Sequence, residues 1–347
     1  MTHWRVPAEW EPHESTWLVW PHAESTWPTV GLEAAREFFC GAVRLIGAAE
    51  RVDLVVRDPD VREAADAALR RAGVDLAPVR FREVVTDDSW VRDFGPTWRV
   101  DAAGRRSAAC WRFNAWGGKY PPYEADAAAG ETIARLAAED AAEVGRIQAA
   151  GFVLEGGSID VDGRGRLITT ERCLLNANRE AGRTKTLMEA RLREWLGVRD
   201  VLWLEDGIAG DDTDGHVDDC ARFGADGTLL VAVETDRGDA NFHPLESNRV
   251  RASEWAADRG VRVRELPMPG PVTAGGQRLP ASYANYLVCN GRVIVPVFGD
   301  RRDGEALRTI QAAHPGREVL AIPSRSIVEG LGSIHCLSQQ RPAGRRD

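Results

Sequence analysis

One cysteine near the end of the chain has neighbours that suit a nucleophile. Cys336 lies in the segment SIHCLSQQ (residues 333–340), after Gly330 and Gly332. A cysteine that serves packing usually lies in an apolar run, whereas this one lies among polar residues in a segment whose glycines favour a loop. Cys336 is therefore either a nucleophile or a half-buried structural thiol, depending on the groups that the rest of the chain places beside it.

Three other segments carry polar residues in unexpected places. They are residues 87–96, with Trp90 and Asp93; residues 154–160, with Glu155 before two glycines; and residues 214–219, with His216 and Asp218. Each has an ordinary interpretation: Trp90 as core packing, Glu155 as a turn or surface carboxylate, and His216 with Asp218 as a solvated strand edge. The glycines after Glu155 weaken its ordinary interpretation, because they allow the backbone to approach closely.

Side-chain alternation suggests which histidine serves the thiol. If residues 214–219 are a strand, His216 and Asp218 share one face, and Asp219 points to the other. His335 is the immediate neighbour of Cys336, so in an extended chain the two side chains point apart. We therefore expect His216, and not His335, to act as the base.

A pocket with these groups predicts chemistry on a guanidinium. Two facing carboxylates match the paired donors of a planar guanidinium, and an indole face suits a delocalised cation. A thiolate is a suitable nucleophile for the central carbon, and a histidine can protonate the leaving nitrogen and then activate water. The residues therefore point to guanidine hydrolysis through a covalent cysteine intermediate.

The elements that position these residues repeat along the chain. Turn dipeptides recur at 103–104, 162–163, 226–227 and 290–291, and after each comes a helical pattern and one more strand. Three strand–turn–strand–helix–strand units are clear, and residues 88–145 form a fourth, with a helix predicted at 124–144. A fifth is completed if residues 334–337 meet an N-terminal strand at 17–20.

This repeat predicts an α/β fold in which residues 1–347 form a single domain of about five modules. A radial arrangement gives a closed ring with a central site, and the alternative is an open mixed α/β sheet. The polar segments above are expected on the first strand of each hairpin, so that a ring brings them together.

Composition restricts the class of protein. The 347 residues are 44% hydrophobic and 28% charged, and the net charge of −9 argues against nucleic acid as a partner. We expect no signal peptide and no membrane span, because the N-terminus is polar and no apolar run approaches the roughly 20 residues required. The six cysteines are scattered without a Cys-x-x-Cys pair, which favours a cytoplasmic location over a disulfide scaffold or a zinc site.

At the level of motifs, the chain resembles the agmatine deiminases, in the peptidyl-arginine-deiminase-like branch of the guanidino-group modifying enzymes. The resemblance runs from PAEWEPH (residues 7–13), through WVRDFGP (90–96), FNAWGGKY (113–120), EGG (155–157) and DGHVD (214–218), to HC at 335–336 and QQ at 339–340. It implies a five-bladed α/β propeller.

The resemblance also implies roles for the site residues. Cys336 would form an amidino-cysteine intermediate, His216 and Glu155 would shuttle protons, Asp93 and Asp218 would clamp the guanidinium, and Trp90 would wall the channel. The products would be N-carbamoylputrescine and ammonia, with neither metal nor organic cofactor. Members are often homodimers or larger homo-oligomers.

Some residues depart from the pattern of this family. Relatives usually carry three glycines before the Ile-His-Cys segment, whereas this chain has Leu331 and Ser333 there, and they tend to have threonine in place of Ser338. Asp212 stands where many relatives place a glutamate near the substrate's amine end. These changes affect the expected pocket for the substrate tail more than the reaction class.

Three alternatives remain open at this point. A metal-dependent ureohydrolase is suggested by the Asp-x-His-x-Asp at 214–218 and the Ser-x-Asp-x-Asp at 158–162, although no Gly-Gly-Asp-His partner is present. A deiminase acting on arginine or peptidyl-arginine would need a cationic partner for a carboxylate, and Arg92 is a nearby candidate. A binding module without catalysis would leave the thiol, imidazole and carboxylates without a joint purpose.

Overall fold

The computed structural model describes residues 4–140 and 144–344, and five of its sheets repeat one connection pattern. In each, two antiparallel strands are followed by a helix and by a strand that pairs in parallel with the second one. The four modules internal to the chain are β4 (Thr97–Val100), β5 (Arg106–Arg112), α5 (Glu124–Glu139) and β6 (Val144–Val153); β7 (Asp160–Val161), β8 (Arg166–Thr170), α7 (Lys185–Leu196) and β9 (Asp200–Leu204); β10 (Ala221–Phe223), β11 (Leu229–Val233), α8 (Phe242–Ala257) and β12 (Val263–Pro267); and β15 (Leu287–Cys289), β16 (Arg292–Val297), α9 (Asp303–Ala313) and β17 (Glu318–Pro323).

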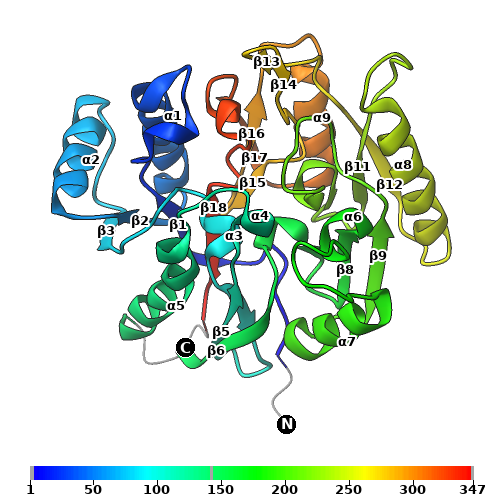
Figure 1. Ribbon diagram of the computed structural model, residues 1–347, viewed down its shortest axis with the longest axis horizontal. Helices are drawn as coiled ribbons and strands as arrows, with labels where there is room; N and C mark the ends of the chain where they lie inside the picture. Colours follow the sequence, from blue (N-terminus) through cyan, green and yellow to red (C-terminus); the bar gives the residue numbers. More distant parts are fainter. Residues whose placement is uncertain (1–3, 141–143, 345–347) are drawn as a thin grey trace.

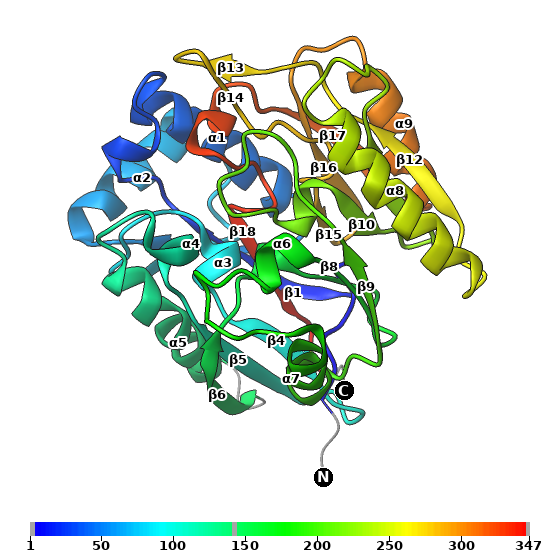
Figure 2. The ribbon, with the colours of Figure 1, turned by 45° about the vertical axis from the view of Figure 1, so that its right-hand side comes forward.

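The fifth module joins the two ends of the chain. Strand β18 (Ser338–Pro342) pairs antiparallel with β1 (His13–Val19), and β1 pairs in parallel with β2 (Arg51–Val56) after helix α1 (Gly31–Gly47). Helix α2 (Pro59–Arg71) then leads to β3 (Val79–Glu83) at the sheet edge. The predicted meeting of the ends is confirmed, with the C-terminal strand beginning at Ser338 and not at residue 334 (Figure 2).

The remaining elements are short. They are α3 (Val91–Phe94), α4 (Ala115–Gly118), α6 (Glu171–Leu174), the β13 (Thr273–Ala274) and β14 (Gln277–Arg278) hairpin, and 3-10 turns at Glu24–Thr26, Gly156–Ser158, Val217–Asp219 and Ile327–Gly330. The helices of the five modules lie at the periphery and the strands lie toward the centre (Figure 1). No helix among the described residues is long and apolar enough to cross a membrane.

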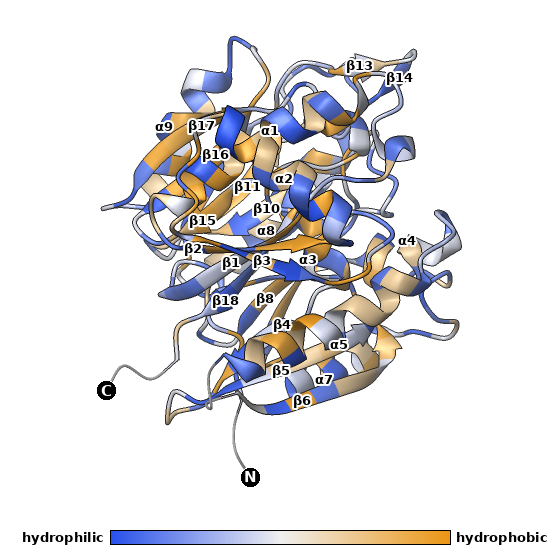
Figure 3. Ribbon diagram, turned by 90° about the vertical axis from the view of Figure 1, so that its left-hand side faces the viewer, coloured by the Kyte–Doolittle hydropathy of each residue, from blue (hydrophilic) through white to orange (hydrophobic). Residues whose placement is uncertain are grey.

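The predicted hairpin turns are confirmed. The glycines at 104, 163, 227 and 291 have φ of +75°, +70°, +81° and +72°, the left-handed region that a tight turn requires and that glycine adopts without strain. The central strands are rich in apolar residues, as the hydropathy colours show (Figure 3), and many of these residues are buried.

Two local predictions were wrong. The helix predicted at 124–144 ends at Glu139, and Val144 begins β6; residues 141–143 lie outside the described part of the chain. The polar segments do not lie on the first strand of each hairpin. They lie in the short turns just before it: α3 before β4, and the 3-10 turns Gly156–Ser158 before β7 and Val217–Asp219 before β10. Strand alternation therefore does not apply to His216 and Asp218.

Candidate active site

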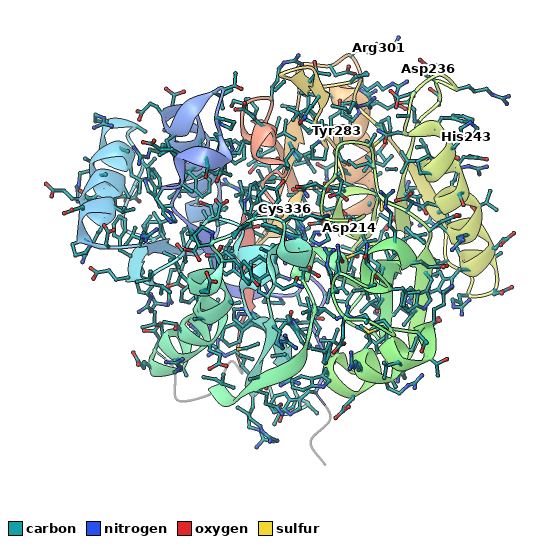
Figure 4. All side chains as sticks on the ribbon, in the orientation of Figure 1. Asp214, Asp236, His243, Tyr283, Arg301 and Cys336 are labelled. Atoms are coloured by element: carbon teal, nitrogen blue, oxygen red, sulfur yellow. The ribbon has the colours of Figure 1, made fainter. Side chains whose placement is uncertain are left out.

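A cavity of about 640 Å³ has Cys336 in its lining. Of the residues predicted for the site, it is also lined by Trp90, Asp93, Asp212 and His216. Glu155 and Asp218 are not part of the lining; both are fully buried. Cys336 lies near the centre of the molecule, at the start of the segment that leads into β18 (Figure 4).

The surroundings of Cys336 favour the neutral thiol over the thiolate. Burial, and then the carboxylates of Asp218, Asp219 and Asp93, raise the pKa of Cys336 well above its ordinary value. The Nδ2 of Asn285 donates to Sγ at 2.9 Å, and Sγ lies 3.6 Å from Oδ2 of Asp218. A bound cation would lower this pKa, because it offsets the surrounding negative charge.

Asp218 presents one oxygen to the protein and keeps the other free. Its Oδ2 lies 2.6 Å from Nδ1 of His335, whereas its buried Oδ1 has no hydrogen-bond partner in the described part of the chain. Burial opposes ionisation of Asp218, but the His335 hydrogen bond and charge outweigh burial and lower the pKa of Asp218. A buried, ionised oxygen without a partner is suited to receive a substrate N–H.

His335 belongs to a buried network and does not line the cavity. Its Nε2 lies 3.1 Å from Oε2 of Glu9, and Glu9 also accepts hydrogen bonds from Arg222 and from the amide of Val288. The side chains of His335 and Cys336 both approach Oδ2 of Asp218. Residues 334–337 form a turn, so the prediction that the two side chains point apart in an extended chain does not apply. Glu9 fixes the orientation of His335, which in turn holds Asp218.

Asp93 and His216 form the opposite pair. The Oδ2 of Asp93 accepts from Nε1 of Trp116 at 2.9 Å, its Oδ1 accepts from the Gly157 amide at 2.9 Å, and Nδ1 of His216 lies 3.8 Å from Oδ1. Burial alone would lower the pKa of His216, but the carboxylate of Asp93 and the Cys173 thiol outweigh burial and raise this pKa well above its ordinary value. The imidazole is therefore a proton donor in the resting site.

Glu155 lies behind His216 and is fixed by a buried arginine. Nε of Arg179 donates to Oε1 of Glu155 at 2.7 Å, and Oε2 has no partner among the described residues. A Cβ at Gly157 would lie 2.6 Å from Nδ1 of His216, so glycine is needed there for the close approach that the sequence suggested. The turn after Glu155 thus packs directly against the side chains of His216, Asp93 and Asp218.

Trp90 forms a wall of the cavity. It is 5% exposed, its ring centroid lies 6.0 Å from that of Trp27, and its Nε1 donates to Asp88 at 3.1 Å. Leu331, which departs from the family's glycine run, takes a φ of +71°, the backbone region that favours glycine. The backbone conformation expected of a glycine is therefore present even though the residue is leucine.

Acidic residues outnumber basic ones in the lining of the cavity. Seven carboxylic acids line it, against one lysine, Lys119, and the imidazole of His216. The acids are Asp87, Asp88, Asp93, Asp126, Asp212, Asp219 and Glu329. Arg92 does not line the cavity, because its guanidinium donates to Gln340 and to the His335 carbonyl.

At the cavity mouth, Asp212 accepts a hydrogen bond from the hydroxyl of Tyr120, and its backbone carbonyl accepts one from Lys119. Burial raises the pKa of Asp212. The cavity therefore has a carboxylate at its mouth as well as beside the thiol.

Two groups of residues have the donors of a metal site. The donor atoms of Glu155, Cys173 and His216 lie within 4.8 Å of one another, as do those of Asp218, Asp219 and Cys336. Both groups contain residues of the site just described, so a soft divalent metal would compete with substrate chemistry there.

The ureohydrolase motifs do not form a metal centre. Asp160 accepts from Arg222 at 2.9 Å, Asp162 accepts from Arg166 and from two turn amides, and Asp214 pairs with Lys119 and Arg179. These carboxylates are occupied by cations and backbone amides of the chain. The alternative therefore lacks its ligand set.

Several residues of the site were not identified from the sequence. They are Glu9, Trp116, Arg179, Asp219 and Asn285. Asn285 lies just before β15, the position in its module that corresponds to the other site turns. The sixty-residue period marks this position as equivalent to the other site turns, but the residue type alone did not single out Asn285.

A thiol, an imidazole and paired carboxylates in an acidic cavity define a site for cysteine-dependent chemistry on a cation. Residues 5–342 match the model of the Porphyromonas-type peptidyl-arginine deiminases, and the chain belongs to this family of guanidino-modifying hydrolases. An agmatine deiminase of Pseudomonas aeruginosa (strain LESB58) is 38% identical over 99% of this chain and 96% of its own.

Solved structures agree with this assignment. C. jejuni agmatine deiminase with substrate bound has a TM-score of 0.87 and 31% identity, covering 99% of this chain and 97% of its own. The agmatine deiminase of Enterococcus faecalis has a TM-score of 0.89 and 31% identity over 98% and 96% of the two chains. A dimethylarginine dimethylaminohydrolase at 16% identity and a TM-score of 0.52 shares only the α/β fold.

Proposed function

We propose that this chain hydrolyses agmatine to N-carbamoylputrescine and ammonia, with Cys336 as the nucleophile. The observation that carries the proposal is the cavity with the thiol in its lining, which has seven carboxylic acids and a single lysine. Agmatine carries a positive charge at both ends, so an acidic cavity suits it from the mouth to the thiol. Full-length relatives named agmatine deiminases support the same substrate.

In the first half of the reaction, the guanidinium binds between Asp93 and Asp218, with Trp90 beside it. Its charge lowers the pKa of Cys336, so the thiol loses its proton to solvent. The thiolate then attacks the central carbon and forms a C–S bond. His216 donates its proton to the leaving nitrogen, the C–N bond breaks, and ammonia departs. An amidino-cysteine remains.

In the second half, neutral His216 takes a proton from water, and the hydroxide adds to the same carbon. The C–S bond then breaks, N-carbamoylputrescine leaves, and the thiolate of Cys336 returns. Glu155, fixed by Arg179, stabilises the imidazolium that forms. The proton left on the hydroxide-derived oxygen passes to the thiolate, which restores the thiol of Cys336. One water is consumed and one ammonia is released, and the proton that the thiol gave to solvent converts this ammonia to ammonium.

We infer that the five modules form a closed five-bladed propeller and a single domain over residues 1–347. The repeated sheet order and the pairing of β18 with β1 support this arrangement. The following stay predictions: a cytoplasmic location, the lack of nucleic-acid and membrane partners, the lack of a cofactor, and assembly into a homodimer or larger oligomer.

The decisive experiment compares agmatine, arginine, a peptidyl-arginine and guanidino-amines of other lengths as substrates. We expect ammonia and the carbamoyl product from agmatine at the highest kcat/KM, because arginine adds a carboxylate to an acidic cavity. Urea as the product, or a higher kcat/KM for arginine, would overturn the proposal. Cys336→Ala should abolish product formation, while Cys40→Ala, a buried thiol of α1, should not.

A further inference from the structure

We propose that Asn285 is a further catalytic residue, whose side-chain N–H holds the Cys336 thiolate. The proposal rests on the proposed function, in which Cys336 reacts as a thiolate. Asn285 is 1% exposed and lies in the turn before β15, the module that supplies none of the residues predicted for the site.

The contacts of the amide determine which of its atoms faces the thiol. Oδ1 of Asn285 accepts from the backbone amides of His335, at 3.1 Å, and Cys336, at 3.4 Å. Nδ2 donates to Oδ1 of Asp219, at 3.0 Å, and to Sγ of Cys336, at 2.9 Å. A flipped amide would place NH2 against two N–H donors and oxygen against a carboxylate, so only one orientation satisfies all four contacts.

The thiolate needs such a donor because its other neighbours oppose it. Burial and three carboxylates raise the pKa of Cys336, and the Asn285 hydrogen bond acts in the opposite direction. In the described part of the chain, Asn285 supplies the side-chain donor bonded to Sγ. The N–H is also available when the thiolate leaves the carbon again, so it serves both halves of the reaction.

Asn285 is held in place on both sides. On one side, the backbone carbonyl of Asn285 accepts from the His335 amide at 3.3 Å. On the other side, the amide of the preceding Ala284 donates to the Ser282 hydroxyl. This hydroxyl in turn donates to the Asp219 carbonyl at 2.7 Å. The turn that carries the donor is therefore tied to both neighbouring site segments, which keeps the donor oriented before substrate binds.

The test measures the alkylation of Cys336 by iodoacetamide as a function of pH, read on the Cys336 peptide by mass spectrometry. Asn285→Asp keeps the shape of the side chain and an acceptor for the loop amides but removes the N–H. We expect the alkylation midpoint to rise by about one to two pH units and kcat/KM to fall roughly 10- to 100-fold, the usual effect of losing a hydrogen bond to a charged group.

The matched control is Asn248→Ala. Asn248 is a buried asparagine whose side chain, among the described residues, bonds to residues 205 and 206. Its alkylation midpoint should equal that of the parent. If Asn285→Asp does not fold, Asn285→Ala, which adds no charge, is expected to show the same upward shift.

Both variants are needed, because the carboxylate of Asn285→Asp would raise the pKa of Cys336 by its charge alone. If Asn285→Ala keeps the parent midpoint, a shift in Asn285→Asp comes from the added charge, and the proposal fails. Alkylation does not depend on the substrate. A parent chain that is inactive on agmatine, yet shows the Asn285-dependent shift, would refute the proposed function and leave the role of Asn285 standing.

Discussion

Substituting Gly332 by alanine is expected to distort the wall of the cavity beside the nucleophile. A Cβ at position 332 would lie 2.6 Å from Cζ3 of Trp90 and 3.0 Å from Cβ of Cys336. Trp90 has little freedom to move away, because its Nε1 donates to Asp88 and its ring packs against Trp27. The strain must therefore displace either the indole or the nucleophile.

The size of the effect follows from these contacts. Non-bonded carbon atoms pack at about 3.5–4.0 Å, so the new methyl group is roughly 1 Å too close. Such overpacking costs about 1–3 kcal/mol, or a fall of roughly 1–4 °C in Tm for a chain of 347 residues. A shift of about 1 Å at a reacting centre costs on the order of 100-fold in rate. We expect Gly332→Ala to fold, with a lower Tm and kcat/KM reduced by about two orders of magnitude.

The assay pairs ammonia release from agmatine with thermal unfolding. Gly151→Ala is the control, because a Cβ at this exposed position in β6 meets nothing within 4 Å and its φ is not positive. It should leave both readouts near the parent values. Parent-like kcat/KM in Gly332→Ala would show that Trp90 and Cys336 are not coupled through this contact, and the account of the wall would be wrong.

Three further predictions concern charge and metal. Burial raises the pKa of Asp126 to about 8. Between about pH 4 and 8, the native state therefore binds a proton that the unfolded state has lost. The free energy of unfolding should fall as the pH rises through this range. Asp126→Asn should flatten that slope in urea titrations at several pH values, and an unchanged slope would contradict the assigned cause. Asp212→Asn should raise KM for agmatine about 3- to 10-fold and leave KM for butylguanidine, which lacks the amine, unchanged. An equal rise in KM for both compounds would show that Asp212 does not contact the amine. EDTA should not reduce activity, whereas micromolar Zn²⁺ should inhibit reversibly through the Cys-His-carboxylate groups; loss of activity with EDTA would favour the metal-dependent alternative.

The repeat made the fold predictable. It did not predict where the polar residues lie within each module. The turn glycines and the helical patterns between them are local signals, and they gave the hairpins and helices to within a few residues. Whether His216 lies on a strand or in the turn before it depends on where the chain begins to pair with β11. This pairing begins at Ala221, the first residue of β10. Strand pairing is a tertiary property, so period-two alternation was applied where no strand exists.

The site residues that sequence analysis found are those with unusual chemistry for their surroundings. Cys336, His216 and Glu155 stand out because a thiol, an imidazole and a carboxylate beside glycines are rarely placed by packing alone. Asn285 and Glu9 have no such signal, since a single asparagine or glutamate suits any turn or surface. Their roles follow only from partners far away in the sequence, such as the 51 residues that separate Asn285 from Cys336.

The position of the site residues in turns, and not on strands, explains how five modules can serve one reaction. Side chains on a strand are directed by the pleat toward one of two sheet faces, whereas a turn at the strand's start can direct a side chain along the strand axis, beyond the sheet edge. Each module contributes such a turn: those of Asp93, Glu155, His216, Asn285 and Cys336. Cys336 lies two residues before Ser338, whose register partner in β1 is Leu18. The nucleophile is therefore positioned by the pairing of the two ends of the chain, and a substitution that weakens the β1–β18 pairing should reduce activity before it unfolds the other four modules.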